Sequence, residues 1–144
     1  MVTELDMLDY STQGAFGDGT TWGTDSESPV VVGAGTSIFE DVGVVDALRL
    51  IETVPGLVIL DVRMPVEFAD ERISGAINLD FYRDDFEQCI SALDRDARYL
   101  LYCRSGGRSA FTLETMQRLG FMHVAHLAPG MEGWVDAGLP VVRD

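Results

Sequence analysis

Tyr-Cys-Arg-Ser-Gly-Gly-Arg-Ser, residues 102–109, joins the end of an apolar run to the start of a helical pattern. In open parallel sheets, ligands bind at such strand-to-helix junctions. Cys103 lies there under the free N–H groups and positive dipole end of the following helix, and Arg104 and Arg108 add positive charge. The paired glycines let the backbone amides converge on the sulfur or on an anion bound to it. This predicts a nucleophilic cysteine cradling an anionic group; the alternative is a structural cysteine in a loop that only turns.

The chain on both sides of this loop alternates between two apolar patterns. Helix-period stripes occupy residues 44–51, 86–93 and 107–119, and uninterrupted apolar runs occupy residues 57–60, 99–102 and 123–127. Uninterrupted runs are typical of strands buried on both faces, and the helices between them imply right-handed crossovers to parallel neighbours. The sequence therefore predicts an α/β fold with a small, mostly parallel sheet.

The length of 144 residues fits one globular domain with some chain to spare. Residues 10–29 are dense in Gly, Ser, Thr and Asp and show no apolar periodicity. That composition is typical of a poorly ordered segment. We therefore expect an acidic, poorly ordered N-terminal extension over residues 1–35 and a single domain over residues 36–144.

Charge narrows the range of partners. The formal net charge is −14, with 24 acidic residues against 10 basic ones. The resulting field repels phosphate backbones and anionic lipid, so we expect neither nucleic acid nor a membrane surface as a partner. All the basic residues are arginines, which excludes Schiff-base chemistry and a lysine general base.

Cys89 and Cys103 are the only cysteines, too few for a disulfide scaffold, so a reducing compartment is the default and we expect a cytoplasmic protein. The longest uncharged apolar stretch, residues 29–39, is too short to span a bilayer. The N-terminus lacks the basic region of a secretory signal, although a signal already removed leaves no trace.

Cys89 lies on an apolar stripe, which favours an inert thiol; the alternative is a resolving partner that forms a disulfide with Cys103.

The loop resembles the active-site loop of the rhodanese-like sulfurtransferases. Residues 60–63 (Leu-Asp-Val-Arg), followed by residues 67–68 and 75–78, are similar to the family's first motif, and residues 130–134 with 138–141 are similar to its C-terminal motif. The resemblance covers about residues 36–142. It implies a single rhodanese-like domain with a five-stranded parallel sheet and helices on both faces.

The resemblance also implies a mechanism. Cys103 would take a sulfane sulfur from a donor such as thiosulfate, become a persulfide, and pass the sulfur to cyanide or a thiol, the thiol of a protein included. It implies no cofactor and no metal, and we expect a monomer.

Roles for the neighbouring residues follow from the same comparison. The backbone N–H groups of the loop would stabilise the persulfide; the loop comprises Arg104, Ser105, Gly106, Gly107, Arg108 and Ser109. The guanidinium of Arg108, or of Arg104, would hold the donor's oxyanion. Asp61 and Arg63 end the neighbouring strand, where they either fix the loop through charge-assisted hydrogen bonds or form an ordinary structural ion pair.

Two other functions use the same fold. Cysteine phosphatases and arsenate reductases of similar fold have a longer loop, Cys-x-x-x-x-x-Arg, whereas only four residues separate Cys103 from Arg108. A binding or regulatory module without catalysis is the second alternative, with a partner held by the acidic extension or the pocket. The presence of Cys103 favours the enzyme.

Two further patterns carry no function. Residues 30–35 look like a strand leading to a dinucleotide loop, but the third glycine position is Ile38 and Thr53 stands where an acid is needed. His123 and His126 are the only histidines and lie far from Cys103 in sequence, so they form no zinc motif. We expect them to serve surface or core packing.

Overall fold

The structure, a computed structural model, describes residues 36–144. It contains five strands and five helices in these residues. In chain order they are β2 (Ile38–Val42), α1 (Val44–Thr53), β3 (Val58–Asp61), α2 (Pro65–Asp70), β4 (Ile77–Asn78), α3 (Phe86–Ser91), β5 (Arg98–Tyr102), α4 (Gly107–Arg118), β6 (His123–Leu127) and α5 (Gly130–Asp136). The extension expected over residues 1–35 and the glycine-rich residues 30–35 lie outside the described part.

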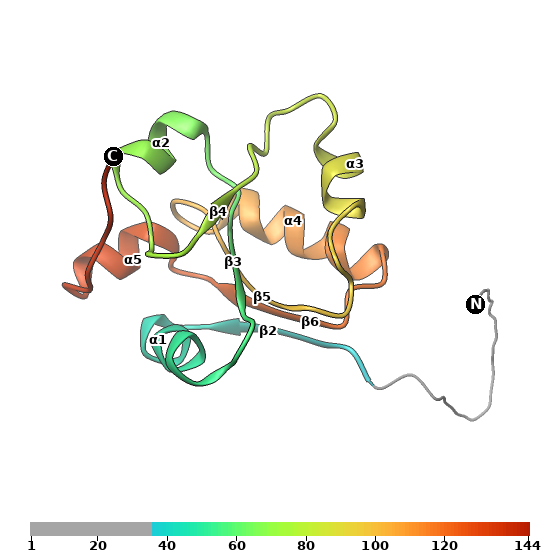
Figure 1. The fold of residues 1–144 in the computed structure, drawn as a ribbon, viewed down its shortest axis with the longest axis horizontal. Helices are drawn as coiled ribbons and strands as arrows, with labels where there is room; N and C mark the ends of the chain where they lie inside the picture. The colour runs from blue at the N-terminus through green and yellow to red at the C-terminus, as the bar shows by residue number, and fades with distance from the viewer. Residues whose placement is uncertain (1–35) are drawn as a thin grey trace, which may run out of the picture. The chain divides into compact units, whose positions relative to one another are not determined.

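The five strands form one sheet in the order β2-β6-β5-β3-β4, and all four pairings are parallel (Figure 1). β5 lies at the centre, which explains its continuous apolar sequence, because a central parallel strand is covered on both faces. All carboxyl ends therefore meet at one edge of the sheet. Cys103 follows β5 at that edge, as the strand-to-helix junction predicts.

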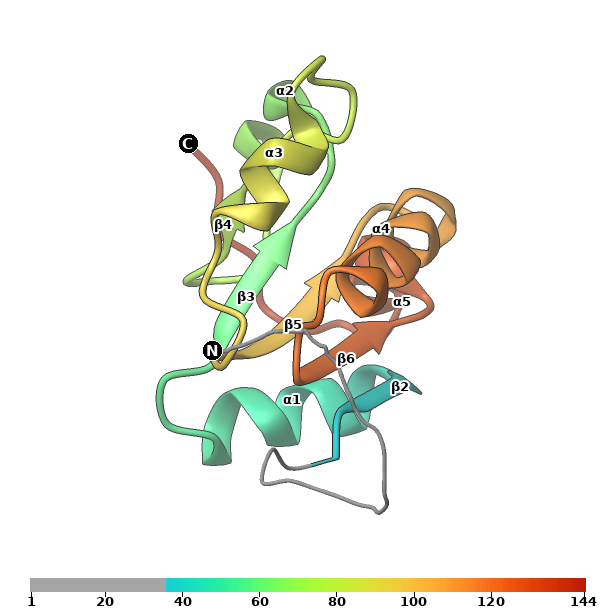
Figure 2. The same ribbon diagram turned by 90° about the vertical axis from the view of Figure 1, so that its right-hand side faces the viewer.

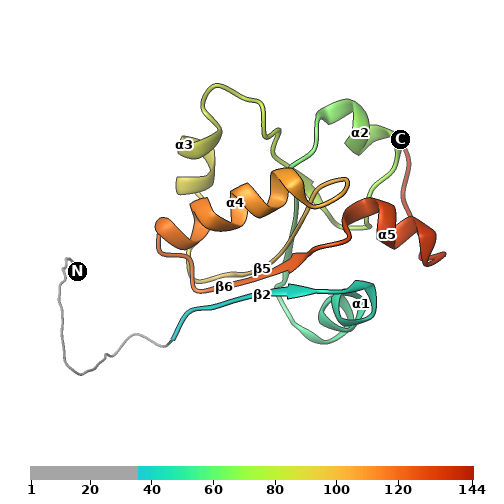
Figure 3. The same cartoon turned by 180° about the vertical axis from the view of Figure 1, so that it is seen from behind.

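Two apolar clusters lie on opposite faces of the sheet. On one face, Leu101 of β5 and Val124 of β6 pack with α3 and α4; on the other, Leu100 packs with Ala47 of α1 and with α5. Figures 1 and 3 show α3 and α4 on one side of the sheet and α1 on the other, and Figure 2 shows the same layers after a quarter turn. The expected α/β class, with a small parallel sheet and helices on both faces, is confirmed.

Three elements lack an apolar pattern in the sequence. β2 is an edge strand in which no side chain is buried, β4 has only two residues, and α2 has six residues with none buried. Elements that bury so little need no apolar periodicity, so the pattern analysis predicted none of them. Trp134, in contrast, is buried and its indole N–H donates to the Pro140 carbonyl at 2.9 Å, an anchor for α5.

Candidate active site

Cys103 lies beneath a tight loop between β5 and α4. Its side chain is 1% exposed. The Gly106 N–H donates to the sulfur at 3.1 Å, and the Ser109 hydroxyl lies 3.2 Å from it. Gly106 has φ +105°, the left-handed conformation that glycine adopts most easily, and there the chain turns into α4. The loop amides thus converge on the sulfur.

Two opposing effects set the pKa of the Cys103 thiol. Burial, the largest effect, raises the pKa because it penalises the thiolate. Hydrogen bonds from the Ser109 hydroxyl and from the N–H groups of Ser109, Gly106 and Ser105 lower it, and together they outweigh burial. The pKa of Cys103 therefore lies below its ordinary value, and the thiolate is the favoured nucleophile at lower pH than for a free thiol.

The loop is held from behind by the first turn of α5. The Met131 N–H donates to the Cys103 carbonyl at 2.9 Å, and the Glu132 N–H donates to the Arg104 carbonyl at 3.0 Å. Gly130 permits this close approach, because a Cβ there would overlap the Arg104 carbonyl and its φ is +66°. The C-terminal motif therefore fixes the curvature of the loop.

Both loop arginines are paired with carboxylates, but unequally. Arg108 makes two bonds to Glu67, at 2.7 and 3.1 Å, and this pair is largely buried. Arg104 makes a single contact with Glu132 at 3.2 Å, and its side chain is 65% exposed. Arg108 thus clamps the start of α4 to α2, whereas Arg104 is the more readily available guanidinium. Sequence reasoning missed Glu67 as a partner because α2 itself was not predicted.

Asp61 and Arg63 form a buried ion pair at the end of β3. Three bonds of 2.7 to 3.1 Å join the guanidinium to the carboxylate, and Arg63 also donates to the Glu71 carbonyl at 2.6 Å. Asn78 donates to the carbonyls of both residues. Within residues 36–144, none of the bonds made by these two side chains goes to residues 103–109. Of the two expected roles, these contacts fit the structural ion pair.

His126 has a place that the sequence did not indicate. Its Nε2 lies 2.6 Å from the Ser109 hydroxyl oxygen, and its Nδ1 lies 2.9 Å from a carboxylate oxygen of Asp41. The expectation of packing alone is therefore incomplete, because His126 is joined to Cys103 through one side chain. Asp41 and His126 are paired residues on the neighbouring strands β2 and β6. This pairing could have indicated the contact, but the sequence patterns did not predict β2.

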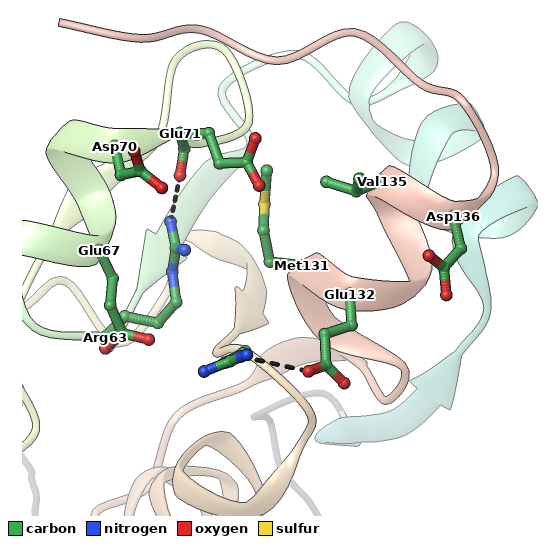
Figure 4. Close-up of a pocket in the computed structure, with 9 residues that line it drawn as sticks. Arg63, Glu67, Asp70, Glu71, Met131, Glu132, Val135 and Asp136 are labelled. Carbon is green, nitrogen blue, oxygen red and sulfur yellow. Dashed lines mark hydrogen bonds and ion pairs between the residues drawn. The ribbon is translucent and has the colours of Figure 1, made fainter.

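A cavity of about 540 Å³ opens beside the loop (Figure 4). Figure 4 shows Glu132 and Asp136 of α5 across it from Asp70 and Glu71. Nine residues line it: Arg63, Glu67, Asp70, Glu71, Arg104, Met131, Glu132, Val135 and Asp136. Cys103 is not among them, so the cavity borders the outer side of the loop rather than the sulfur itself.

The described residues hold a second thiol besides Cys103. Cys89 and Cys103 are both free thiols, and Cys89 is half-buried on α3. Among residues 36–144, no His, Cys, Asp and Glu side chains gather in a set that could hold a metal ion. No helix in this range has the length and apolar character needed to cross a bilayer.

Comparison with known proteins gives concordant matches. A family model described as a rhodanese-like domain matches residues 44–137. A sulfurtransferase of Allochromatium vinosum is 31% identical over 94 residues, which are 65% of this chain and 85% of that protein. An uncharacterized protein of Synechocystis is 34% identical over 87 residues; these are 60% of this chain but only 48% of that protein, so the chain spans about half its length.

A solved structure agrees with these matches. The rhodanese-related protein of Thermoplasma volcanium has a TM-score of 0.63 and 28% identity, and the alignment covers 73% of this chain and 99% of that one. The match therefore extends over nearly all of that solved chain.

Proposed function

The chain belongs to the rhodanese-like domain family, and on that premise we propose that it is a sulfurtransferase that carries a sulfane sulfur on Cys103. The thiolate attacks the outer sulfur of thiosulfate, the sulfur–sulfur bond of the donor breaks, and sulfite leaves with the electron pair. Cys103 is then a persulfide. Cyanide attacks its terminal sulfur to form thiocyanate, or a thiolate attacks to form a new persulfide, and the Cys103 thiolate returns in either case.

The observation that carries this proposal is the position of the sulfur under converging donors. A persulfide places its negative charge on the terminal sulfur, one bond beyond the Cys103 sulfur. The backbone N–H groups that converge on the Cys103 sulfur are fixed next to this charge and would stabilise it without reorganisation during the reaction. The same donors favour the attacking thiolate, as the lowered pKa of Cys103 indicates.

The reaction class is tested with purified protein, thiosulfate and cyanide, by measuring thiocyanate. We expect turnover with thiosulfate and none with an aryl phosphate, because four residues between Cys103 and Arg108 leave a loop narrower than a phosphatase cradle. Phosphate release would contradict the proposal. A reduced, folded protein that transfers sulfur from none of thiosulfate, an alkyl persulfide and a polysulfide would favour a binding module instead.

Arg104 is expected to bind the anionic donor. Replacing it with glutamine should raise the KM for thiosulfate about tenfold with little change in kcat, because one charge-assisted hydrogen bond to the donor is lost. The matched control is Arg143→Gln, since Arg143 is 64% exposed and pairs with Glu71 in the same way. Steady-state kinetics with varied thiosulfate measures both. An unchanged KM in Arg104→Gln would remove Arg104 from the donor site.

A further inference from the structure

Four side chains form a continuous hydrogen-bonded row that ends at the nucleophile. Asp41 of β2 contacts His126 Nδ1 at 2.9 Å, His126 Nε2 contacts the Ser109 hydroxyl of α4 at 2.6 Å, and this hydroxyl lies 3.2 Å from the Cys103 sulfur. We propose that His126 is the proton acceptor for the Cys103 thiol, acting through Ser109, and that Asp41 holds His126 in the required state. His126 is thus a positioning residue that acts through Ser109.

The direction of the row follows from the donors available. The Asp41 carboxylate, when ionised, only accepts hydrogen bonds, so the proton of neutral His126 lies on Nδ1 and Nε2 is free to accept. The 2.6 Å contact therefore has the Ser109 hydroxyl donating to His126. Ser109 has a single proton, and its oxygen is then available to accept the Cys103 S–H.

Proton transfer along this row is balanced within the protein. The Cys103 proton moves to the Ser109 oxygen while the Ser109 proton moves to His126 Nε2, and His126 keeps its Nδ1 proton. The products are a thiolate and an imidazolium, with no other reactant. In this state the two hydrogen bonds of Ser109 are reversed: His126 Nε2 donates to Ser109, and the Ser109 hydroxyl donates to the thiolate.

The two middle side chains of this row, Ser109 and His126, are buried. Ser109 is fully buried and His126 is 4% exposed, so water does not replace either partner. The Asp41 side chain is 69% exposed and connects the row to solvent. The row therefore joins a buried sulfur to the surface through side chains alone.

On β5 and α4, the elements that pack against His126, no other charged side chain forms a hydrogen bond or an ion pair with it. β5 places the aliphatic Leu101 beside it. On α4, Arg108 pairs with Glu67, Arg118 pairs with Glu87, and Glu114 is exposed. Among residues 36–144, the ionisable groups joined to His126 are Asp41 directly and Cys103 through Ser109.

The test is the pH dependence of Cys103 alkylation by iodoacetamide, in the full chain with Cys89→Ala in every sample. The alkylation rate at about pH 6 is divided by the rate at about pH 9.5, where the thiolate forms without help. His126→Gln keeps an amide that can bond to Ser109 but cannot take a proton. We expect this ratio to fall about tenfold in His126→Gln, the effect of raising the apparent pKa of Cys103 by one unit.

Three further variants separate proton transfer from packing. Ser109→Ala should lower the ratio at least as much, and the double variant Ser109→Ala/His126→Gln should lower it no further than Ser109→Ala alone, because the two act as one unit. Asp41→Asn, at an exposed position, should lower it about threefold through loss of the negative charge. His123→Gln, at the other histidine, should leave the ratio unchanged.

The ratio of alkylation rates in the variants either supports or overturns the role of His126. If His126→Gln alkylates with the wild-type ratio, or slows equally at both pH values, the proposal is wrong and the row serves packing only. If His126→Gln does not fold, Asp41→Asn decides: a lower ratio supports the proposal and an unchanged ratio overturns it. The role of the activated thiolate in sulfur transfer rests on the proposed function, but alkylation of Cys103 needs no sulfur donor. Failure of sulfur transfer is therefore distinguishable from failure of this row.

Discussion

Replacing Cys103 with alanine is expected to abolish sulfur transfer from thiosulfate to cyanide, a loss on the order of 10³-fold or more. The reason is covalent: without the sulfur there is no atom to accept the sulfane sulfur, and the remaining loop amides have no persulfide to stabilise. Cys103 belongs to a buried apolar cluster, but alanine differs from it only by the sulfur atom, so the variant should keep the fold. Thiocyanate formation under saturating thiosulfate and cyanide measures the effect.

Cys89→Ala is the matched control for this experiment. Cys89 is the other free thiol, and it lies on α3 outside the loop. We expect its replacement to leave the transfer rate within about twofold, since no part of the proposed reaction uses it. A large loss in Cys89→Ala would restore the resolving-cysteine alternative, and full activity in Cys103→Ala would place the nucleophile elsewhere.

Asp61→Ala is expected to give the largest loss of stability, about 3–5 kcal/mol in the free energy of unfolding. Asp61 is fully buried and Arg63 is 4% exposed, so removal of the carboxylate leaves a buried guanidinium without its counter-charge. The backbone N–H of Arg63 also loses its acceptor, because it donates to Asp61 at 2.9 Å. Both effects act in the same direction.

Urea unfolding measures this change through the shift in midpoint at constant slope. The double variant Asp61→Leu/Arg63→Met removes both charges and should recover most of the loss, because buried ion pairs give little net stability over apolar residues of similar size. Asp85→Ala breaks an exposed ion pair with Arg83 and should leave the midpoint unchanged. A loss in Asp61→Ala as small as that of Asp85→Ala would mean that the Arg63 guanidinium does not depend on this carboxylate for its stability in the fold.

The extent to which the sequence predicted the fold depended on burial. β3, β5 and β6 have continuous apolar sequences because they lie inside the sheet, and their predicted positions agree with the structure to within a residue. β2 lies at an edge, and its sequence Ile-Phe-Glu-Asp-Val places two acids beside apolar residues. Its pairing with β6 is decided by tertiary contacts that a local pattern does not contain.

The same limit applied to the site. The loop around Cys103 is contiguous, so its cysteine, glycines and arginines could be identified together. Glu67 and His126 come from distant parts of the chain, and Asp41 lies 85 residues before His126. Their contacts with the loop depend on strand order, which the sequence patterns left open. The residues that tune a nucleophile are therefore harder to predict than the nucleophile.

The most direct test of the central claim is the intact mass of the protein after incubation with thiosulfate and removal of the excess. We predict a gain of about 32 Da on the wild type and none on Cys103→Ala, as one added sulfur atom requires. Two oxygen atoms give nearly the same mass, but a sulfinic acid is irreversible, whereas cyanide should remove the persulfide sulfur and restore the original mass. A wild-type mass that stays unchanged with thiosulfate, or a gain that cyanide does not reverse, would contradict a Cys103 persulfide formed from this donor.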